Sequence, residues 1–170
     1  MKLPYRFLLT TVVASAALTA CAGKTKPTPP PPQPQETTVQ AVTETGRYKP
    51  GDLDTDACLR QRVIYFDLDK TDIHSEFQAA ISCHAAYLRQ FPNARVTLEG
   101  NADERGTREY NLGLGERRGN SVSSALSGAG ASSSQLNVVS YGEERPVCRE
   151  HGEACWQKNR RVEIIYTSKQ

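Results

Sequence analysis

A run of prolines most limits what this chain can fold into, because it separates two parts of very different folding capacity. Six of the eight residues from Pro27 to Pro34 are proline. Proline has a fixed φ angle and no backbone N–H, so such a run favours extended polyproline II and builds no core. We therefore predict a polar tether over residues 21–57 and one folded domain of common size over residues 58–170. A ligand for a partner's polyproline-binding groove is the alternative interpretation of the run.

Residues 1–20 have the pattern of a signal peptide. Two basic residues precede an apolar run, Phe7 to Ala17, that is too short to span a bilayer as a stable helix. A short membrane anchor or a buried helix is the alternative. The following Leu18-Thr19-Ala20-Cys21 resembles the lipobox of bacterial lipoproteins, which implies cleavage before Cys21 and lipidation of that cysteine. In that group, a residue such as Ala22 after the cysteine implies transport to the outer membrane, with the domain facing the periplasm.

Charge and motifs argue against nucleic-acid binding and against catalysis. The chain has 21 basic and 19 acidic residues, and removal of the two basic residues in the expected signal peptide leaves no formal net charge. Such a balance lacks the basic surface that a phosphate backbone requires. The serines at 132–134 and Ser140 have no Gly-x-Ser-x-Gly setting, and Gly113-x-Gly115 is followed by Arg118 instead of a third glycine. We therefore expect that the protein is not an enzyme, and the catalytic alternative is a cell-wall hydrolase.

Apolar periodicity in the domain alternates between the strand period and the helix period. Strands are expected where β-branched and aromatic residues gather or alternate with polar ones, over residues 62–66, 94–99, 136–141 and 161–166. One helix is expected to begin at Ser75 and end before Pro92, and a second to cover residues 109–127. This order predicts an α+β fold of the type β-α-β-α-β-β, a sandwich in which the helices pack on one mixed sheet.

A charged residue lies on the apolar side of the second expected helix. Its spacing places Arg118 on the same stripe as Leu114 and Val122, one turn from each. A guanidinium among apolar neighbours requires a charged partner, because an unpaired buried charge is costly. The nearest candidate acid is Asp103, in the preceding loop. The pair is either a purely structural ion pair or part of a ligand site, since such loops at strand ends often bind ligands.

The segment around these two residues resembles a known family signature. Gly100-Asn-Ala-Asp-Glu-Arg-Gly-Thr-Arg-Glu-Tyr-Asn-Leu-Gly-Leu-Gly-Glu-Arg-Arg118 is closely similar to the signature of OmpA-like domains. Matching motifs stand before and after it, at Tyr65–Lys70, Val139–Gly142 and Asn159–Arg161. In that family the domain binds the peptide stem of peptidoglycan without a covalent bond. The resemblance implies that the key ligand group is diaminopimelate, whose free end carries an ammonium and a carboxylate.

The resemblance also assigns roles to individual residues. Asp103 matches the family's acid for the ammonium, and Arg118 matches its arginine for the carboxylate, to which a guanidinium offers two parallel hydrogen bonds. The other positions that match residues at the stem or the groove edge are Phe66, Asp67, Asn111, Leu114, Arg160 and Arg161. Many members carry histidine where this chain has Asn101, so the role of that position stays open.

The partners that the resemblance implies are peptidoglycan, the outer membrane through the lipid, and Tol-system proteins of the periplasm. The expected function is therefore an outer-membrane lipoprotein that tethers that membrane to the cell wall as part of a Tol-type system. A sibling OmpA-like lipoprotein that acts mainly as a protein-interaction module is the alternative. No cofactor is implied apart from the covalent lipid on Cys21.

Four cysteines remain after Cys21, and an exported domain lies where disulfides persist. Of the three possible pairings, Cys148–Cys155 with Cys58–Cys83 is favoured because the first bridge is local. A zinc site that uses some of these cysteines with His84 and His151 is the rival, but the ligand spacing is not that of zinc sites, and no metal is expected. His74 and His84 are expected at the surface or boundary of the first helix.

Overall fold

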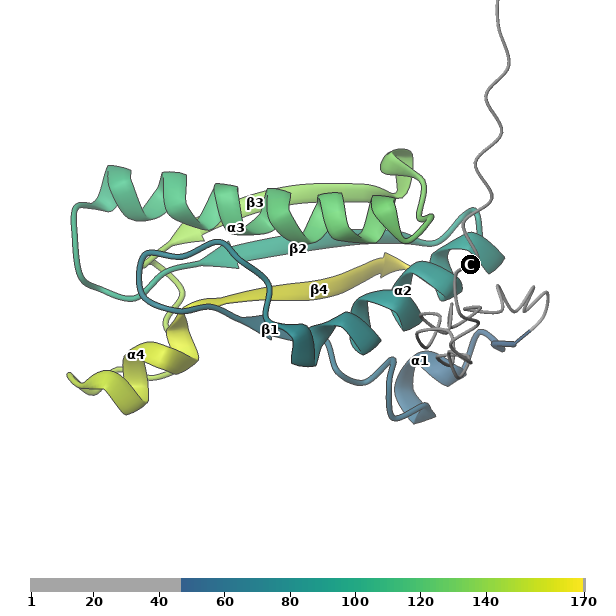
Figure 1. The fold of residues 1–170 in the computed structure, drawn as a ribbon, viewed down its shortest axis with the longest axis horizontal. Coiled ribbons are helices and arrows are strands. Elements are labelled where there is room, and N and C mark those ends of the chain that lie inside the picture. The colour runs from purple at the N-terminus through teal and green to yellow at the C-terminus, as the bar shows by residue number, and fades with distance from the viewer. Residues whose placement is uncertain (1–46, 170) are drawn as a thin grey trace, which may run out of the picture. The chain divides into compact units, whose positions relative to one another are not determined.

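The computed structural model describes residues 47–169 (Figure 1). The predicted signal peptide, the predicted lipidation site Cys21 and the proline run lie outside the described residues. The helices are α1 (Asp52–Thr55), α2 (Gln78–Gln90), α3 (Arg108–Gly128) and α4 (Glu153–Asn159), with short 3-10 turns η1 (Ser75–Phe77) and η2 (Ser133–Gln135). The strands are β1 (Val63–Tyr65), β2 (Arg95–Asn101), β3 (Leu136–Gly142) and β4 (Arg161–Ser168). In the part of the chain from 47 to 169, no helix is long and apolar enough to cross a membrane.

The four strands form one mixed sheet in the order β1-β4-β2-β3. β2 and β3 are parallel because the long helix α3 connects them, whereas β4 runs antiparallel to both of its neighbours, β1 and β2. Helices α2 and α3 run alongside the strands (Figure 1), and their apolar sides share one core with the sheet. The predicted α+β sandwich with helices on one mixed sheet is therefore confirmed.

Helix α3 lies very close to the sheet because glycines face each other at the contact. A Cβ on Gly100 of β2 would lie 1.9 Å from the carbonyl oxygen of Gly115, and one on Gly119 would lie 2.5 Å from Cγ1 of Val138. No side chain fits into these gaps, so glycine is required at both positions. The close approach brings the N-terminal half of α3, which carries Arg118, against the end of β2.

The packed part of the chain begins before the predicted boundary at residue 58. Tyr48 is 4% exposed and Leu53 is fully buried, and both belong to the same core cluster as the strands. The backbone N–H of Tyr48 donates to Oε1 of Gln90 at the end of α2. Residues 48–57 are therefore part of the folded unit, although the sequence prediction placed them in the tether.

Both predicted disulfides are confirmed. Cys58 pairs with Cys83, which joins the segment before β1 to α2. Cys148 pairs with Cys155, which joins the segment after β3 to α4. The second bridge closes a short loop next to the residues described below, because α4 leads directly into β4.

The prediction of His84 at the surface or boundary of the first helix is wrong. Its side chain is fully buried, with Nδ1 3.0 Å from the hydroxyl of Tyr166 and Nε2 3.2 Å from the carbonyl oxygen of Gln61. Burial lowers the pKa of His84 from 6.5 to about 4, since desolvation disfavours the charged imidazolium. His84 is therefore a neutral core residue near neutral pH.

Candidate functional site

A pocket of about 300 Å³ lies where the β1–η1 loop, the β2–α3 loop and the start of α3 meet. Eleven residues line it: Leu68, Asp69, Ala102, Asp103, Arg105, Gly106, Tyr110, Asn111, Leu114, Arg118 and Arg160. Five of the residues predicted from the sequence for the stem or the groove edge thus share one pocket, namely Asp103, Asn111, Leu114, Arg118 and Arg160.

Arg118 is fully buried on the helix side that the apolar stripe predicted. Its Nε donates to the carbonyl oxygen of Lys70 at 3.0 Å, Nη1 to that of Asn101 at 2.9 Å, and Nη2 to that of Asp67 at 2.9 Å. A guanidinium has five N–H donors, so one donor on each terminal nitrogen remains beyond these bonds. Arg118 therefore fastens the β1–η1 loop to the end of β2 and still has donors for an anion.

Burial, and then the nearby charge of Arg160, lowers the pKa of Arg118 from 12.5 to about 10. The group stays charged at neutral pH. Because its direct partners are carbonyl dipoles, a bound carboxylate would supply the full negative charge that a buried guanidinium favours.

Asp103, at the start of the β2–α3 loop, is 3% exposed and is held by two arginines. Arg105 forms a two-pronged pair with it, Nε to Oδ1 at 3.0 Å and Nη2 to Oδ2 at 2.7 Å, and its backbone N–H also donates to Oδ1 at 3.1 Å. Nη1 of Arg160 donates to Oδ2 at 3.1 Å. Burial by itself would raise the pKa of Asp103, but the hydrogen bonds from these two arginines outweigh it and lower the pKa below its usual range. Asp103 is therefore ionised at neutral pH.

The structural ion pair between Asp103 and Arg118, one of the two alternatives that the sequence left open, does not form. Among residues 47–169, the ion-pair partners of Asp103 are Arg105 and Arg160, and the hydrogen bonds of Arg118 go to backbone carbonyls. Arg105 follows Asp103 by two residues, and Arg160 comes from the segment between α4 and β4. Residue types and helix periodicity do not reveal that these arginines pair with Asp103. The two predicted charges instead lie apart on the wall of one pocket.

Asn111 and Leu114 hold the pocket at the start of α3. The Thr107 hydroxyl caps this helix by accepting from the N–H of Tyr110. Nδ2 of Asn111 donates to the carbonyl oxygens of Asp103 and Arg105, both at 3.1 Å. Asn111 therefore fixes the course of the β2–α3 loop, and Leu114 adds an apolar wall one turn before Arg118.

Three other predicted residues do not line the pocket. Phe66 is fully buried, with the guanidinium of Arg118 5.3 Å from its ring centre. The side chain of Asp67 is mostly exposed and pairs with His74 at 3.1 Å. Arg161 pairs with Glu163 on β4. Phe66 and Asp67 act on the pocket through their backbone, since their carbonyl oxygens accept from Arg160 and Arg118.

Sequence reasoning missed several lining residues, of which Arg105 and Asp69 are charged. Asp69 accepts a hydrogen bond from the hydroxyl of Tyr110, across the pocket from its own loop. It is also the one non-glycine residue among residues 47–169 with a positive φ, 56°. A signal for Arg105 exists in the sequence, because it follows Asp103 by two residues within the recognised signature.

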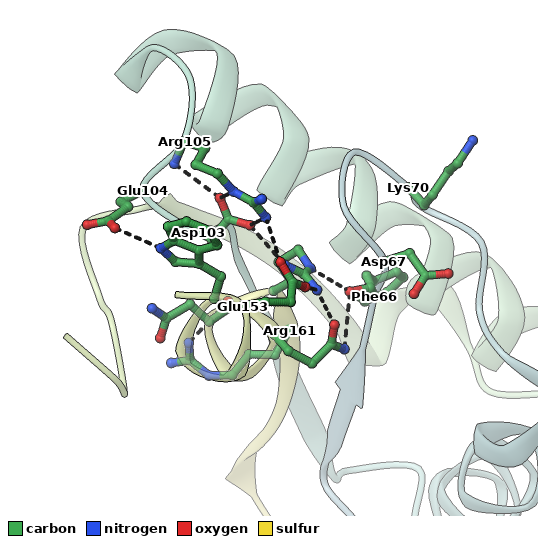
Figure 2. A network of polar contacts seen from close by, with 12 residues as sticks. Phe66, Asp67, Lys70, Asp103, Glu104, Arg105, Glu153 and Arg161 are labelled. Atoms are coloured by element: carbon green, nitrogen blue, oxygen red, sulfur yellow. Dashed lines mark hydrogen bonds and ion pairs between the residues drawn. The ribbon is translucent and has the colours of Figure 1, made fainter. Parts of the chain in front are cut away.

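Helix α4 supports the Asp103 side of the pocket. Figure 2 shows Asp103, Arg105 and Glu153 pointing toward one another, with Glu104 close by. Glu153 of α4 accepts from Arg160 and lies 3.6 Å from Nη2 of Arg105. The charged groups that line the pocket itself are two carboxylates and three guanidiniums, namely Asp69, Asp103, Arg105, Arg118 and Arg160. This set suits a ligand that carries both charges and places its negative group at Arg118.

The model of the OmpA family matches residues 65–160, which include every part of this pocket. The chain belongs to the OmpA family. The peptidoglycan-associated lipoprotein of Haemophilus influenzae is 46% identical over 71% of this chain and 76% of its own length. That of Legionella pneumophila is 37% identical over 98% of each chain.

Solved structures agree with the family assignment. The crystal structure of the peptidoglycan-associated lipoprotein from Burkholderia pseudomallei has a TM-score of 0.67 and 41% identity, and the match covers 70% of this chain and all of that one. The C-terminal domain of Helicobacter pylori MotB shares the fold, with a TM-score of 0.57 at 22% identity over 62% of this chain and 84% of that one. The OmpA-family fold is thus shared with both a lipoprotein and a MotB domain.

Asn101, whose role the sequence left open, is a buried residue at the end of β2, next to the pocket-lining Ala102. Its backbone carbonyl accepts from Arg118, and its Nδ2 donates to the carbonyl oxygen of Glu99 at 2.9 Å. Within the described part of the chain, its buried Oδ1 has no hydrogen-bond partner. The backbone of Asn101 therefore helps to hold Arg118.

Proposed function

We propose that this protein is a lipid-anchored component of the outer membrane that binds the diaminopimelate-containing stem peptide of peptidoglycan without a covalent bond. The observation that carries the proposal is the pair of buried, oppositely charged groups, Asp103 and Arg118, on the wall of one pocket. The free end of diaminopimelate has an ammonium and a carboxylate at fixed spacing. A ligand with two opposite charges fits two opposite charges held apart by a rigid scaffold.

The Arg118 side of the pocket supports recognition of the ligand carboxylate. Two N–H donors on its terminal nitrogens remain beyond its carbonyl bonds, and two such donors suit the two oxygens of a carboxylate. The start of α3 adds a favourable field for a negative group through the dipole of the helix. Asn111 and Leu114 complete this wall of the pocket.

The Asp103 side supports recognition of the ligand ammonium. Asp103 is ionised and almost wholly shielded from water, so a positive group that reaches it gains more than it would at the surface. The similar proteins from Haemophilus influenzae and Burkholderia pseudomallei are named peptidoglycan-associated lipoproteins, which agrees with this ligand.

Attachment at two ends explains how modest affinity suffices. We propose that a lipid on Cys21 holds one end in the outer membrane, that the proline-rich segment serves as the tether, and that the domain binds the wall in the periplasm. Because the two attachments act on one chain, binding to abundant stems is effectively intramolecular and retention is firm. We propose that the protein partners are Tol-system proteins of the periplasm. We also propose that the protein binds its ligand and does not catalyse a reaction.

Sedimentation with purified peptidoglycan tests the proposed ligand. Asp103→Asn keeps the shape of the side chain and removes its charge, and we expect it to leave the protein in the supernatant. Asp54→Asn is the matched control, since Asp54 is an exposed carboxylate that pairs with Arg62 and Lys169, away from the pocket. Equal sedimentation of the Asp103→Asn variant and the wild type, with both folded by circular dichroism, would refute the site.

A further inference from the structure

We propose that Arg105 is an internal competitor for the ligand ammonium at Asp103, and that binding requires Arg105 to move from Asp103 to Glu153. This inference rests on the proposed function and concerns the affinity of the same site. Arg105 lines the pocket, yet it is not an anion receptor in this structure, because its guanidinium is already paired with Asp103.

Asp103 has no acceptor position left for a second cation. A carboxylate offers about four lone-pair directions. Here Oδ1 accepts from the backbone N–H and the Nε of Arg105, and Oδ2 accepts from Nη2 of Arg105 and Nη1 of Arg160. An arriving ammonium therefore has to displace one of the guanidiniums.

Arg105 is the guanidinium that is free to leave. Its side chain is 31% exposed, whereas that of Arg160 is 2% exposed. Arg160 is also fixed from three sides, by the carbonyl oxygen of Phe66 at 2.9 Å and by the side chains of Glu153 and Gln157. Displacement of Arg160 would break its bonds to two side chains of α4, whereas Arg105 can leave Asp103 and keep its contacts with α4.

A second place for Arg105 exists beside the first. Its Nη2 lies 3.6 Å from Oε2 of Glu153, and its guanidinium carbon lies 4.2 Å from the ring centre of Trp156. The indole is itself held, because its Nε1 donates to Glu104 at 2.7 Å. A small shift toward α4 thus keeps a carboxylate and an aromatic partner for Arg105 while it frees Asp103.

The exchange makes the gain from an ammonium at Asp103 depend on the release of Arg105. When an ammonium takes Asp103 and Arg105 takes Glu153, each charge has a partner before and after binding. A ligand with a carboxylate alone gains Arg118 but leaves Asp103 closed by Arg105. The competition lowers the apparent affinity for a ligand that needs Asp103 by the fraction of molecules in which Asp103 is open, whereas a ligand with a carboxylate alone does not bear this cost.

Removal of the competitor tests the inference. We expect Arg105→Ala to bind a synthetic stem tripeptide that ends in meso-diaminopimelate about tenfold more tightly in calorimetry, as for a site that is open in one molecule of ten. Arg108→Ala is the matched control, since Arg108 is an exposed arginine near the same loop that pairs with Glu144, and its affinity should equal that of the wild type. Glu153→Gln should weaken binding more in the wild-type background than in the Arg105→Ala background, where only the contact of Glu153 with Arg160 is lost.

The chain's single tryptophan gives a readout that needs no variant. Arg105 lies over the indole ring of Trp156, so movement of the guanidinium changes the fluorescence emission of Trp156. We expect the emission of the wild type to change in step with tripeptide binding. Constant emission during saturation, or equal or weaker binding by Arg105→Ala, would overturn the competitor role while leaving the proposed function intact. Tripeptide binding by Asp103→Asn equal to that of the wild type would overturn both.

Discussion

Substitution of Arg118 should destabilise the fold as well as remove a ligand contact. Arg118→Met keeps much of the side-chain volume and removes three hydrogen bonds, to the carbonyl oxygens of Lys70, Asn101 and Asp67. A hydrogen bond to a charged group contributes about 1.5–3 kcal/mol, and a buried carbonyl left without a partner is costly. The variant recovers part of this sum, because it no longer desolvates a guanidinium. We therefore expect a loss of about 2–4 kcal/mol in the free energy of unfolding.

Urea denaturation followed by circular dichroism measures this loss. The midpoint should fall while the slope stays the same, since the surface exposed on unfolding changes little. Arg117→Met is the control at the next position; Arg117 is exposed beside the ring of Tyr110, and its substitution should change the stability by less than about 0.5 kcal/mol. If Arg118→Met unfolds at the same urea concentration as the wild type, the carbonyl bonds do not hold the β1–η1 loop and the reasoning fails.

Three further outcomes follow from the fold. Because the pKa of His84 is about 4 when folded and 6.5 when unfolded, the unfolded chain binds more protons between these values, so stability is lost as pH falls from 6.5 to 4; the wild type should lose about 3 kcal/mol more than His84→Gln in pH-dependent denaturation. Replacement of Cys148 and Cys155 by serine should lower stability by about 2.5 kcal/mol on loop-entropy grounds, as measured by urea denaturation, without loss of peptidoglycan sedimentation. Gly100→Ala should prevent close packing of α3 and lower the melting temperature by more than about 10 °C. Gly128→Ala is the control: Gly128 faces open space at the end of α3, and its substitution should leave the melting temperature equal or higher.

The sequence was sufficient to predict the sheet, the two long helices and the burial of Arg118. The 3.6-residue period places Arg118 on the stripe of Leu114 and Val122, and all three are buried. The partner of Arg118 was not predictable, because backbone carbonyls at the ends of loops carry no signal in residue types. Asp103 lies on the same pocket as predicted, but its neighbours in space include Arg160, which is 57 residues away in sequence.

Short elements escaped prediction for a related reason. Helix α4 has only seven residues and no repeated apolar stripe, so its role beside Asp103 depends on tertiary contacts. Tyr48 and Leu53 are isolated apolar residues in a polar segment, and periodicity cannot distinguish them from a tether. His84 was misjudged since the helix side that it occupies is covered by Tyr166 from β4.

The most direct test of the account compares two stem tripeptides that differ only in the last residue, meso-diaminopimelate in one and L-lysine in the other. Both bring an ammonium to Asp103, but only the first brings the extra carboxylate for Arg118. Loss of a charge-assisted contact to a buried guanidinium corresponds to about 2–3 kcal/mol. Calorimetry should therefore show the lysine peptide bound about 30- to 150-fold more weakly. Equal affinity for the two peptides would contradict the claim that Arg118 binds the free carboxylate of the stem.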